Sequence, residues 1–130
     1  MPEQDTVRRA AKKKREGKAP STQAGEFVRE EIHHIREGKH GARSTKQAIA
    51  IGLSKARKAG VDLKPPRKAQ TSERTRRNAQ RAYDRGQDKR RRNPSPQRSR
   101  ATMNALKREG RKAASPRALS RQARRRRRAR

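Results

Sequence analysis

The sequence contains no cysteine and no tryptophan, and it has one phenylalanine and one tyrosine among 130 residues. The absence of cysteine excludes a disulfide framework and any cysteine-ligated zinc site. The scarcity of aromatic rings argues against binding of single-stranded nucleic acid by base stacking, which needs several exposed rings. Acidic residues are also few, because 12 Asp and Glu stand against 41 Lys and Arg, for a formal net charge of +29.

Long apolar runs are missing as well. No stretch of about 18 apolar residues predicts a membrane span, and the N-terminus has no apolar core typical of a secretory signal. We therefore expect a cytoplasmic protein without a membrane partner. The larger apolar side chains number only 15, and nine of them lie between residues 21 and 63. This number is too small for one core over the whole chain, so we expect a small folded unit within a solvated polycation.

Charge and apolar content divide the chain into three predicted parts. Residues 1–20 form a basic N-terminal arm, residues 21–63 a helical hairpin, and residues 64–130 an Arg- and Lys-rich tail with 26 basic and four acidic residues. The predicted fold class is all-α, a short hairpin of two amphipathic helices at about 23–37 and 45–59. Both flanking arms are expected to be largely disordered, with nascent helices in the tail.

The two central helices have clear sequence signals. In the first, the apolar residues that share one stripe are Ala24, Phe27, Val28, Ile32 and Ile35. Glu31 falls inside this stripe and therefore needs a partner. The second helix begins with a capping-box pattern, Ser44 followed by Gln47, and ends at Gly60. Its small residues at i, i+4 and i+8, which allow a close helix–helix approach, are Ala48, Gly52 and Ala56.

A hairpin of this size is only marginally stable by itself. One prediction is a homodimer through residues 21–63, in which the two apolar stripes pack together. The alternative is a monomer that folds fully only on nucleic acid.

The loop between the helices, residues 38–46, reads GKHGARSTK. Its two glycines let the backbone approach an anion, and the start of the following helix presents N–H groups and a positive dipole end. The predicted phosphate-binding residues of this loop are Lys39, His40, Arg43, Ser44 and Lys46. The alternative is an ordinary connector in which Gly38 ends one helix and Ser44 caps the next.

Three basic runs supply the other predicted phosphate contacts. They comprise Lys12, Lys13, Lys14 and Arg15; Arg90, Arg91 and Arg92; and Arg124, Arg125, Arg126, Arg127 and Arg128. Each phosphate contact releases condensed counterions, so six to ten contacts would lower affinity by roughly 10³–10⁵ between 50 and 200 mM salt. The expected partner is DNA, with duplex favoured, and RNA is the other candidate.

No residues form a recognisable catalytic constellation, so no enzyme activity and no cofactor are predicted. The histidines are His33, His34 and His40. His33 and His34 are adjacent, so they face different sides of a helix and cannot chelate one metal ion together. No metal site is therefore expected.

The segment GEFVREEIHHIREGKHGARSTKQAIAIGLSKARKAG, residues 25–60, resembles a small family of basic bacterial proteins, chiefly proteobacterial. Members of this family are often labelled DNA-binding or plasmid-stabilisation proteins. The portion GKHGARSTKQAIAIGLSKAR carries most of the resemblance. It implies a bacterial, cytoplasmic and nucleoid-associated setting, and it supplies no catalytic or binding residues.

The leading hypothesis is a histone-like, nucleoid-associated protein that binds DNA without sequence specificity, through the phosphate backbone. A second hypothesis is an RNA-binding or ribosome-associated basic protein. A third is a plasmid-maintenance factor whose hairpin at 21–63 binds a partner protein, with the tails as localising arms.

Overall fold

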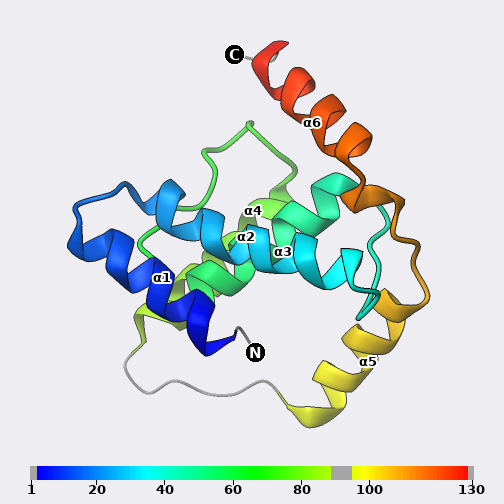
Figure 1. Ribbon diagram of the computed structural model, residues 1–130. Helices are drawn as coiled ribbons and strands as arrows, with labels where there is room; N and C mark the ends of the chain where they lie inside the picture. The colour runs from blue at the N-terminus through cyan, green and yellow to red at the C-terminus, as the bar shows by residue number, and fades with distance from the viewer. Residues whose placement is uncertain (1–2, 89–94, 129–130) are drawn as a thin grey trace. The chain divides into compact units, whose positions relative to one another are not determined.

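A computed structural model describes residues 3–88 and 95–128 of the chain. These residues are all-α, with six α-helices and one short 3-10 helix (Figure 1). The elements are α1 (Gln4–Arg15), α2 (Pro20–Arg36), α3 (Thr45–Lys58), α4 (Glu73–Gln87), α5 (Pro96–Lys107), η1 (Lys112–Ala114) and α6 (Pro116–Arg128). None of the helices in this described part has both the length and the apolar composition needed to cross a membrane.

The predicted hairpin with disordered arms is wrong. Helices α2 and α3 lie where the sequence indicates, but α1, α4, α5 and α6 are helical elements of the arms. The physical reason is the size of the core residues. Among the described residues, nine of the 14 buried hydrophobic ones are alanines, whereas the expectation of disorder counted only larger apolar side chains as core. Alanine loses no side-chain entropy on burial and favours helix, so short helices pack here without a wide apolar stripe.

The chain forms two compact units, and each combines two separate segments. The first unit comprises Met1–Glu30 and Gly52–Arg92, and the second comprises Glu31–Ile51 and Asn93–Arg130. Helices α2 and α3 therefore contribute residues to both units.

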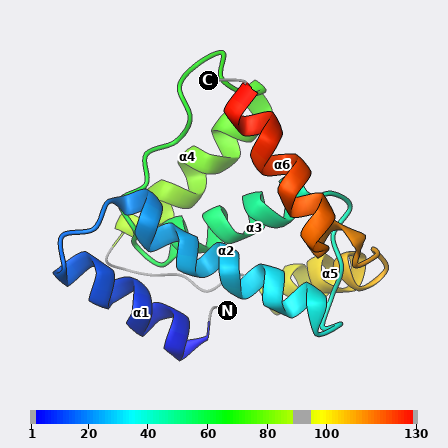
Figure 2. The same ribbon diagram turned by 45° about the horizontal axis from the view of Figure 1, so that its top comes forward.

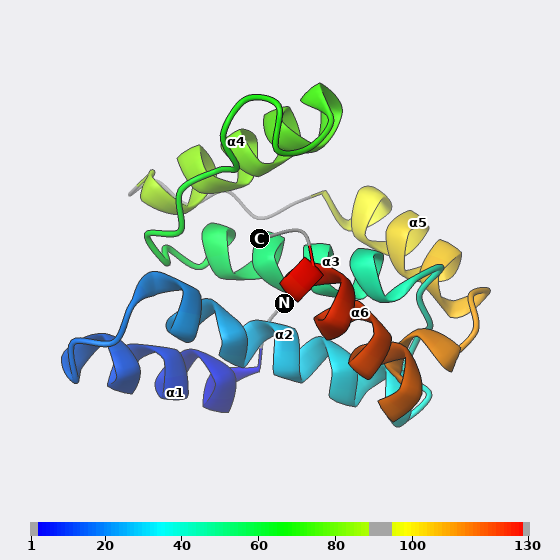
Figure 3. The same ribbon diagram turned by 90° about the horizontal axis from the view of Figure 1, so that it is seen from above.

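In the first unit, α1 lies beside the first part of α2 (Figures 1 and 3). The core cluster of this unit consists of Ala10, Ala24, Phe27, Ala56 and Val61. The buried residues of α1 are Thr6 and Ala10, while Val7 is 40% exposed. Helix α1 thus docks through its small residues, and its one large apolar side chain lies partly in solvent.

An ion-pair cluster adds to this contact between α1 and α2. The buried carboxylate of Glu26 lies 3.0 Å from Nε of Arg9 and 2.6 Å from Nζ of Lys13. The hydrogen bond from Lys13 lowers the pKa of Glu26, and the bond from Arg9 lowers it further against the opposing effect of burial. A nearly buried carboxylate is tolerated here because two basic side chains of α1 partner it.

The small residues of α3 allow its backbone to lie against α2, as the sequence predicts. A Cβ atom at Gly52 would lie 2.6 Å from the Cα atom of Val28, closer than real Cβ contacts permit. Ala56, one turn later, is fully buried. Gly52 is therefore a packing glycine.

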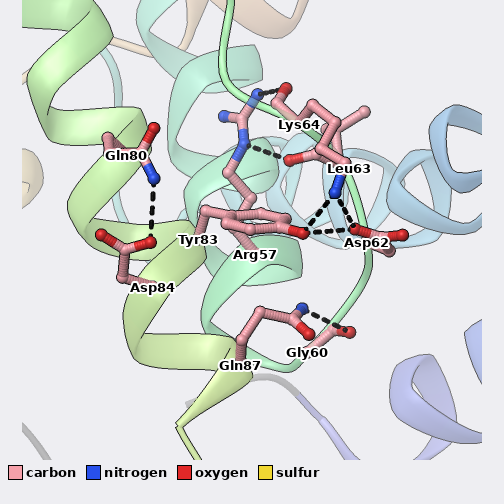
Figure 4. Close-up of polar contacts among 9 residues, drawn as sticks. All are labelled: Arg57, Gly60, Asp62, Leu63, Lys64, Gln80, Tyr83, Asp84 and Gln87. Atoms are coloured by element: carbon pink, nitrogen blue, oxygen red, sulfur yellow. Dashed lines mark hydrogen bonds and ion pairs between the residues drawn. The ribbon is translucent and has the colours of Figure 1, made fainter.

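Helix α4 packs on the end of α3 in the same way. It buries Ala79 and Ala82, and at Gly86 a Cβ atom would collide with the backbone carbonyl of Arg57. Figure 4 shows the polar contacts beside this packing. The hydroxyl of Tyr83 donates to Oδ1 of Asp62 at 2.5 Å and accepts from Nζ of Lys64 at 2.8 Å. These contacts fix α4 to the segment that follows α3.

In the second unit, the loop after α2 runs beside the segment between α5 and η1 (Figure 2). Backbone N–H groups of Gly41 and Ala42 donate to the carbonyls of Leu106 and Gly110, at 2.8 and 3.0 Å. Other bonds to this part of the chain come from Arg36, whose Nε donates to the Ala114 carbonyl at 3.0 Å, and from Thr45. Hydrogen bonds from backbone and side-chain donors to backbone carbonyls thus hold the loop in place.

We predict that Gly52→Ala lowers the free energy of unfolding by about 1–3 kcal/mol, because the added methyl group has to push α3 away from the backbone of α2. Urea unfolding followed by circular dichroism measures this change. Gly25→Ala is the matched control, since a Cβ there meets nothing within 4 Å. It should leave stability unchanged or raise it by up to about 1 kcal/mol. Equal losses in both variants would refute the close packing of α2 and α3.

We predict that Glu26→Gln lowers the free energy of unfolding at pH 7 by about 1–3 kcal/mol, because it removes the carboxylate that Arg9 and Lys13 bind. The pKa of Glu26 is lowered in the folded protein. Its contribution is therefore complete above the unfolded pKa and is lost as the pH falls through the folded pKa. Denaturant midpoints between pH 7 and pH 3 should fall less steeply in Glu26→Gln than in the wild type.

Glu16→Gln is the control for this pH series, since Glu16 is exposed at the end of α1. It removes one carboxylate without removing an α1–α2 ion pair. If Glu16→Gln and Glu26→Gln changed the fall of the denaturant midpoint between pH 7 and pH 3 equally, the Glu26 cluster would not anchor α1.

Candidate nucleic-acid interface

Helix α6 is the most basic element of the second unit. Its sequence, PRALSRQARRRRR, contains seven arginines and no acidic residue, and none of its residues is buried. Ser115 caps it, because its Oγ accepts a hydrogen bond from the backbone N–H of Ala118 at 3.1 Å, and Pro116 occupies the first helical position. The arginines of the last turn suit the negative end of the helix dipole. The cap, the proline and the helix dipole therefore stabilise α6, which has no buried residue.

The five arginines at the end of α6, residues 124–128, all lie exposed. At about 100° per residue, five consecutive side chains spread around the whole circumference of a helix. None of the five forms an ion pair within the described part of the chain. The cluster therefore presents five guanidinium groups, each able to bind a phosphate bidentately.

The N-terminal basic run divides on α1. Lys12, Lys14 and Arg15 are exposed, whereas the ammonium group of Lys13 is held at 2.6 Å from Oε1 of Glu26. Lys13 thus contributes to the fold, and its three neighbours are open to an anion. Arg90, Arg91 and Arg92, also predicted to contact phosphate, lie outside the described residues.

Only some of the predicted phosphate-binding residues of the loop between α2 and α3 lie at the surface. Lys39, Arg43, Ser44 and Lys46 are exposed, but His40 is buried, so a phosphate at the surface does not reach its ring. Lys39 also lies 3.4 Å from the carboxylate of Glu37.

The backbone donors of this loop are largely committed to internal bonds. The N–H of Arg43 donates to Oε1 of Gln47 at 2.6 Å, and the N–H of Gln47 donates to Oγ of Ser44 at 3.1 Å. Gly41 has no room for a Cβ, which would collide with the carbonyl of Glu109. The second glycine of the loop thus serves packing within the second unit, and anion binding here falls to the exposed side chains.

The first unit has a basic surface that is missing from the sequence-based prediction. On α4, positions i, i+3, i+7 and i+11 share one face opposite the docked one, and they hold Arg74, Arg77, Arg81 and Arg85. The first three are exposed and Arg85 is partly exposed. The spacing of these arginines in the sequence is the signal for this surface, and an analysis of apolar periodicity does not detect it because Tyr83 is the one large apolar residue of α4.

Positive charge also accumulates at the end of α3. Partial burial lowers the pKa of Lys58, and the charges of Arg85 and Lys55 lower it further. An anion bound at this point would relieve that repulsion, because an opposite charge favours the charged form of a lysine. The α4 stripe and Lys58 therefore form a second candidate phosphate-binding surface.

No family model, curated protein or solved structure matches the chain. The resemblance of residues 25–60 to a family of basic bacterial proteins therefore stays a prediction. The function proposed below depends on the two basic surfaces, namely the arginines of α6 and the stripe of α4.

Proposed function

We propose that this protein binds the phosphate backbone of nucleic acid without sequence specificity, with duplex DNA as the preferred partner, in a nucleoid-associated role. The observation that carries the proposal is α6, a capped helix with seven arginines, no acidic residue and no buried residue. A polycation with a net charge of +29 repels itself, and a polyanion relieves that repulsion.

The dimensions of α6 suit a duplex. An α-helix with its side chains is about 10–12 Å across, and the major groove of B-DNA is about 12 Å wide. A helix lying in that groove has a phosphate backbone on either side. Because residues 124–128 radiate in all directions, guanidinium groups reach both backbones at any rotation of the helix about its axis. Such contacts carry no sequence information.

The aromatic residues favour a duplex over a single strand. Phe27 is 1% exposed in the core, and the hydroxyl of Tyr83 is bonded to Asp62 and Lys64. The ammonium group of Lys64 also lies 5.0 Å from the centre of the Tyr83 ring. Phe27 is therefore closed to bases and Tyr83 is a single, partly buried ring, whereas binding by base stacking uses several exposed rings.

The α4 stripe of the first unit supports binding to more than one segment of nucleic acid. Each unit carries its own arginine surface, so one chain can contact two segments or two turns of one duplex. Bridging of this kind compacts DNA.

We predict that the full chain binds duplex DNA with affinity that falls by roughly 10³–10⁵ between 50 and 200 mM salt, as expected for six to ten phosphate contacts. Fluorescence anisotropy with duplex DNA, duplex RNA and single strands of equal length measures this. Duplex DNA should bind most tightly. Tighter binding of duplex RNA would favour the RNA-binding alternative, and a shallow salt dependence on every probe would refute backbone binding.

We predict that replacing Arg124, Arg126 and Arg128 with Gln reduces the slope of log K against log salt by ~2.7, since each lost contact reduces it by about 0.9. The matched control replaces Lys39, Arg43 and Lys46 with Gln, which removes the same number of charges from the loop. We expect this control to reduce the slope by less than about 1. A larger effect in the loop triple than in the α6 triple would place the main contact at the loop.

A further inference from the structure

A buried cluster of one carboxylate and two imidazoles lies in the second unit. Glu31 on α2 is fully buried although it is a carboxylic acid, because it lies in the apolar stripe, and His34 follows it by one turn. His40, from the loop after α2, is also buried. Oε2 of Glu31 lies 3.1 Å from Nε2 of His40, and Oε1 lies 3.9 Å from Nδ1 of His34. One ligand atom from each of the three residues lies within 4.8 Å of the others.

The hydrogen bond on the far side of the His40 ring fixes where its proton is. Nδ1 lies 2.9 Å from the carbonyl oxygen of Gly41, and a carbonyl only accepts, so Nδ1 carries the proton. In the neutral ring, Nε2 is then a bare lone pair. It forms no hydrogen bond in the described structure and faces Oε2 of Glu31 at 3.1 Å. Two acceptors at this distance inside a protein need a positive charge between them, either a proton or a metal ion.

We propose that Glu31, His34 and His40 bind a divalent transition-metal ion of the zinc class. In a tetrahedral site with bonds of about 2.1 Å, neighbouring ligand atoms lie about 3.4 Å apart. The distances of 3.1 and 3.9 Å lie on either side of this value. Two imidazoles and one carboxylate suit Zn²⁺, whereas Mg²⁺ and Ca²⁺ prefer oxygen ligands alone.

The surroundings of the cluster match those of metal-binding histidines. A histidine ligand almost always donates its other ring N–H to a carbonyl or a carboxylate, as Nδ1 of His40 does to Gly41. The side chain of His34 is 13% exposed, so an entering ion would reach the cluster from this side, with a water as its fourth ligand. The ion would tie the loop to α2. This site is independent of the proposed nucleic-acid binding.

The test uses the full chain without a polyhistidine tag, freed of metal by a chelator and then titrated with Co²⁺. The expected result is a visible d–d absorption band of tetrahedral intensity that saturates at one equivalent and disappears when Zn²⁺ is added. Zn²⁺ should also raise the melting temperature of the protein, because it binds the folded state preferentially.

Variants separate the ligands from their neighbour. His34→Asn and Glu31→Gln should weaken Zn²⁺ binding in calorimetry by more than about 100-fold, beyond the effect typical of an outer-shell residue. His33→Ala is the matched control, since His33 is adjacent but exposed, and it should bind Zn²⁺ like the wild type. Because Glu31→Gln can disturb folding, the partly exposed His34 is the decisive position, with helicity checked by circular dichroism.

Two results would overturn the proposal. One is the absence of a saturable Co²⁺ band in the wild type, together with NMR spectra that show protons on both ring nitrogens of His40, which would identify a Glu31–His40 ion pair. The other is an equal loss of Zn²⁺ affinity in His33→Ala and His34→Asn, which would mean that the ion binds elsewhere.

Discussion

Three carboxylates on α2 contact basic side chains, an imidazole or a backbone N–H group at the points where other segments dock. Glu26 binds Arg9 and Lys13, Glu30 accepts a hydrogen bond from the backbone N–H of Glu3, and Glu31 faces His40. Burying a charge is costly unless it is paired, so each carboxylate requires its segment to be in place. The chain has only 12 acidic residues, and three of them are buried on α2, so few carboxylates remain on the surface to offset the arginines of α4 and α6. The same distribution of acids therefore supports packing and leaves the arginines available to a polyanion.

The sequence predicts those parts of the fold that depend on strong local signals. The cap by Ser44, the apolar stripe of α2 and the packing role of Gly52 are confirmed, whereas the side chain of Gln47 accepts from the N–H of Arg43 instead of that of Ser44. The docking of α1 and α4 was not predictable from a count of large apolar residues, because Ala10 and Gly86 make the contacts. Small residues bury little area each, and their value lies in letting backbones approach closely. Amino-acid composition alone therefore predicts that such a chain is disordered.

The candidate sites were likewise only partly predictable from local sequence. The density of arginine in the sequence predicts the basic cluster of α6. The spacing of arginines along α4 also indicates a basic face, but a search for apolar periodicity does not detect it. For the loop, the local sequence predicted a phosphate contact for His40. The ring is instead buried where Gly41 and Ala42 pair with distant carbonyls, one in the last turn of α5 and one between α5 and η1. The position of Glu31 in an apolar stripe indicated a buried partner. That partner is His40, and it reaches Glu31 because the loop folds back on α2, which no local sequence pattern specifies.

The central claim is that an ordered helical scaffold exists before binding and presents α6 to nucleic acid. Hydrogen–deuterium exchange of the full chain, free and with duplex DNA, tests it most directly. The account predicts protected amides in α2 and α3 of the free protein, and new protection in α6 when DNA is added. It would be contradicted by rapid exchange throughout the free chain, or by protection that appears in the other helices on binding while α6 stays unchanged.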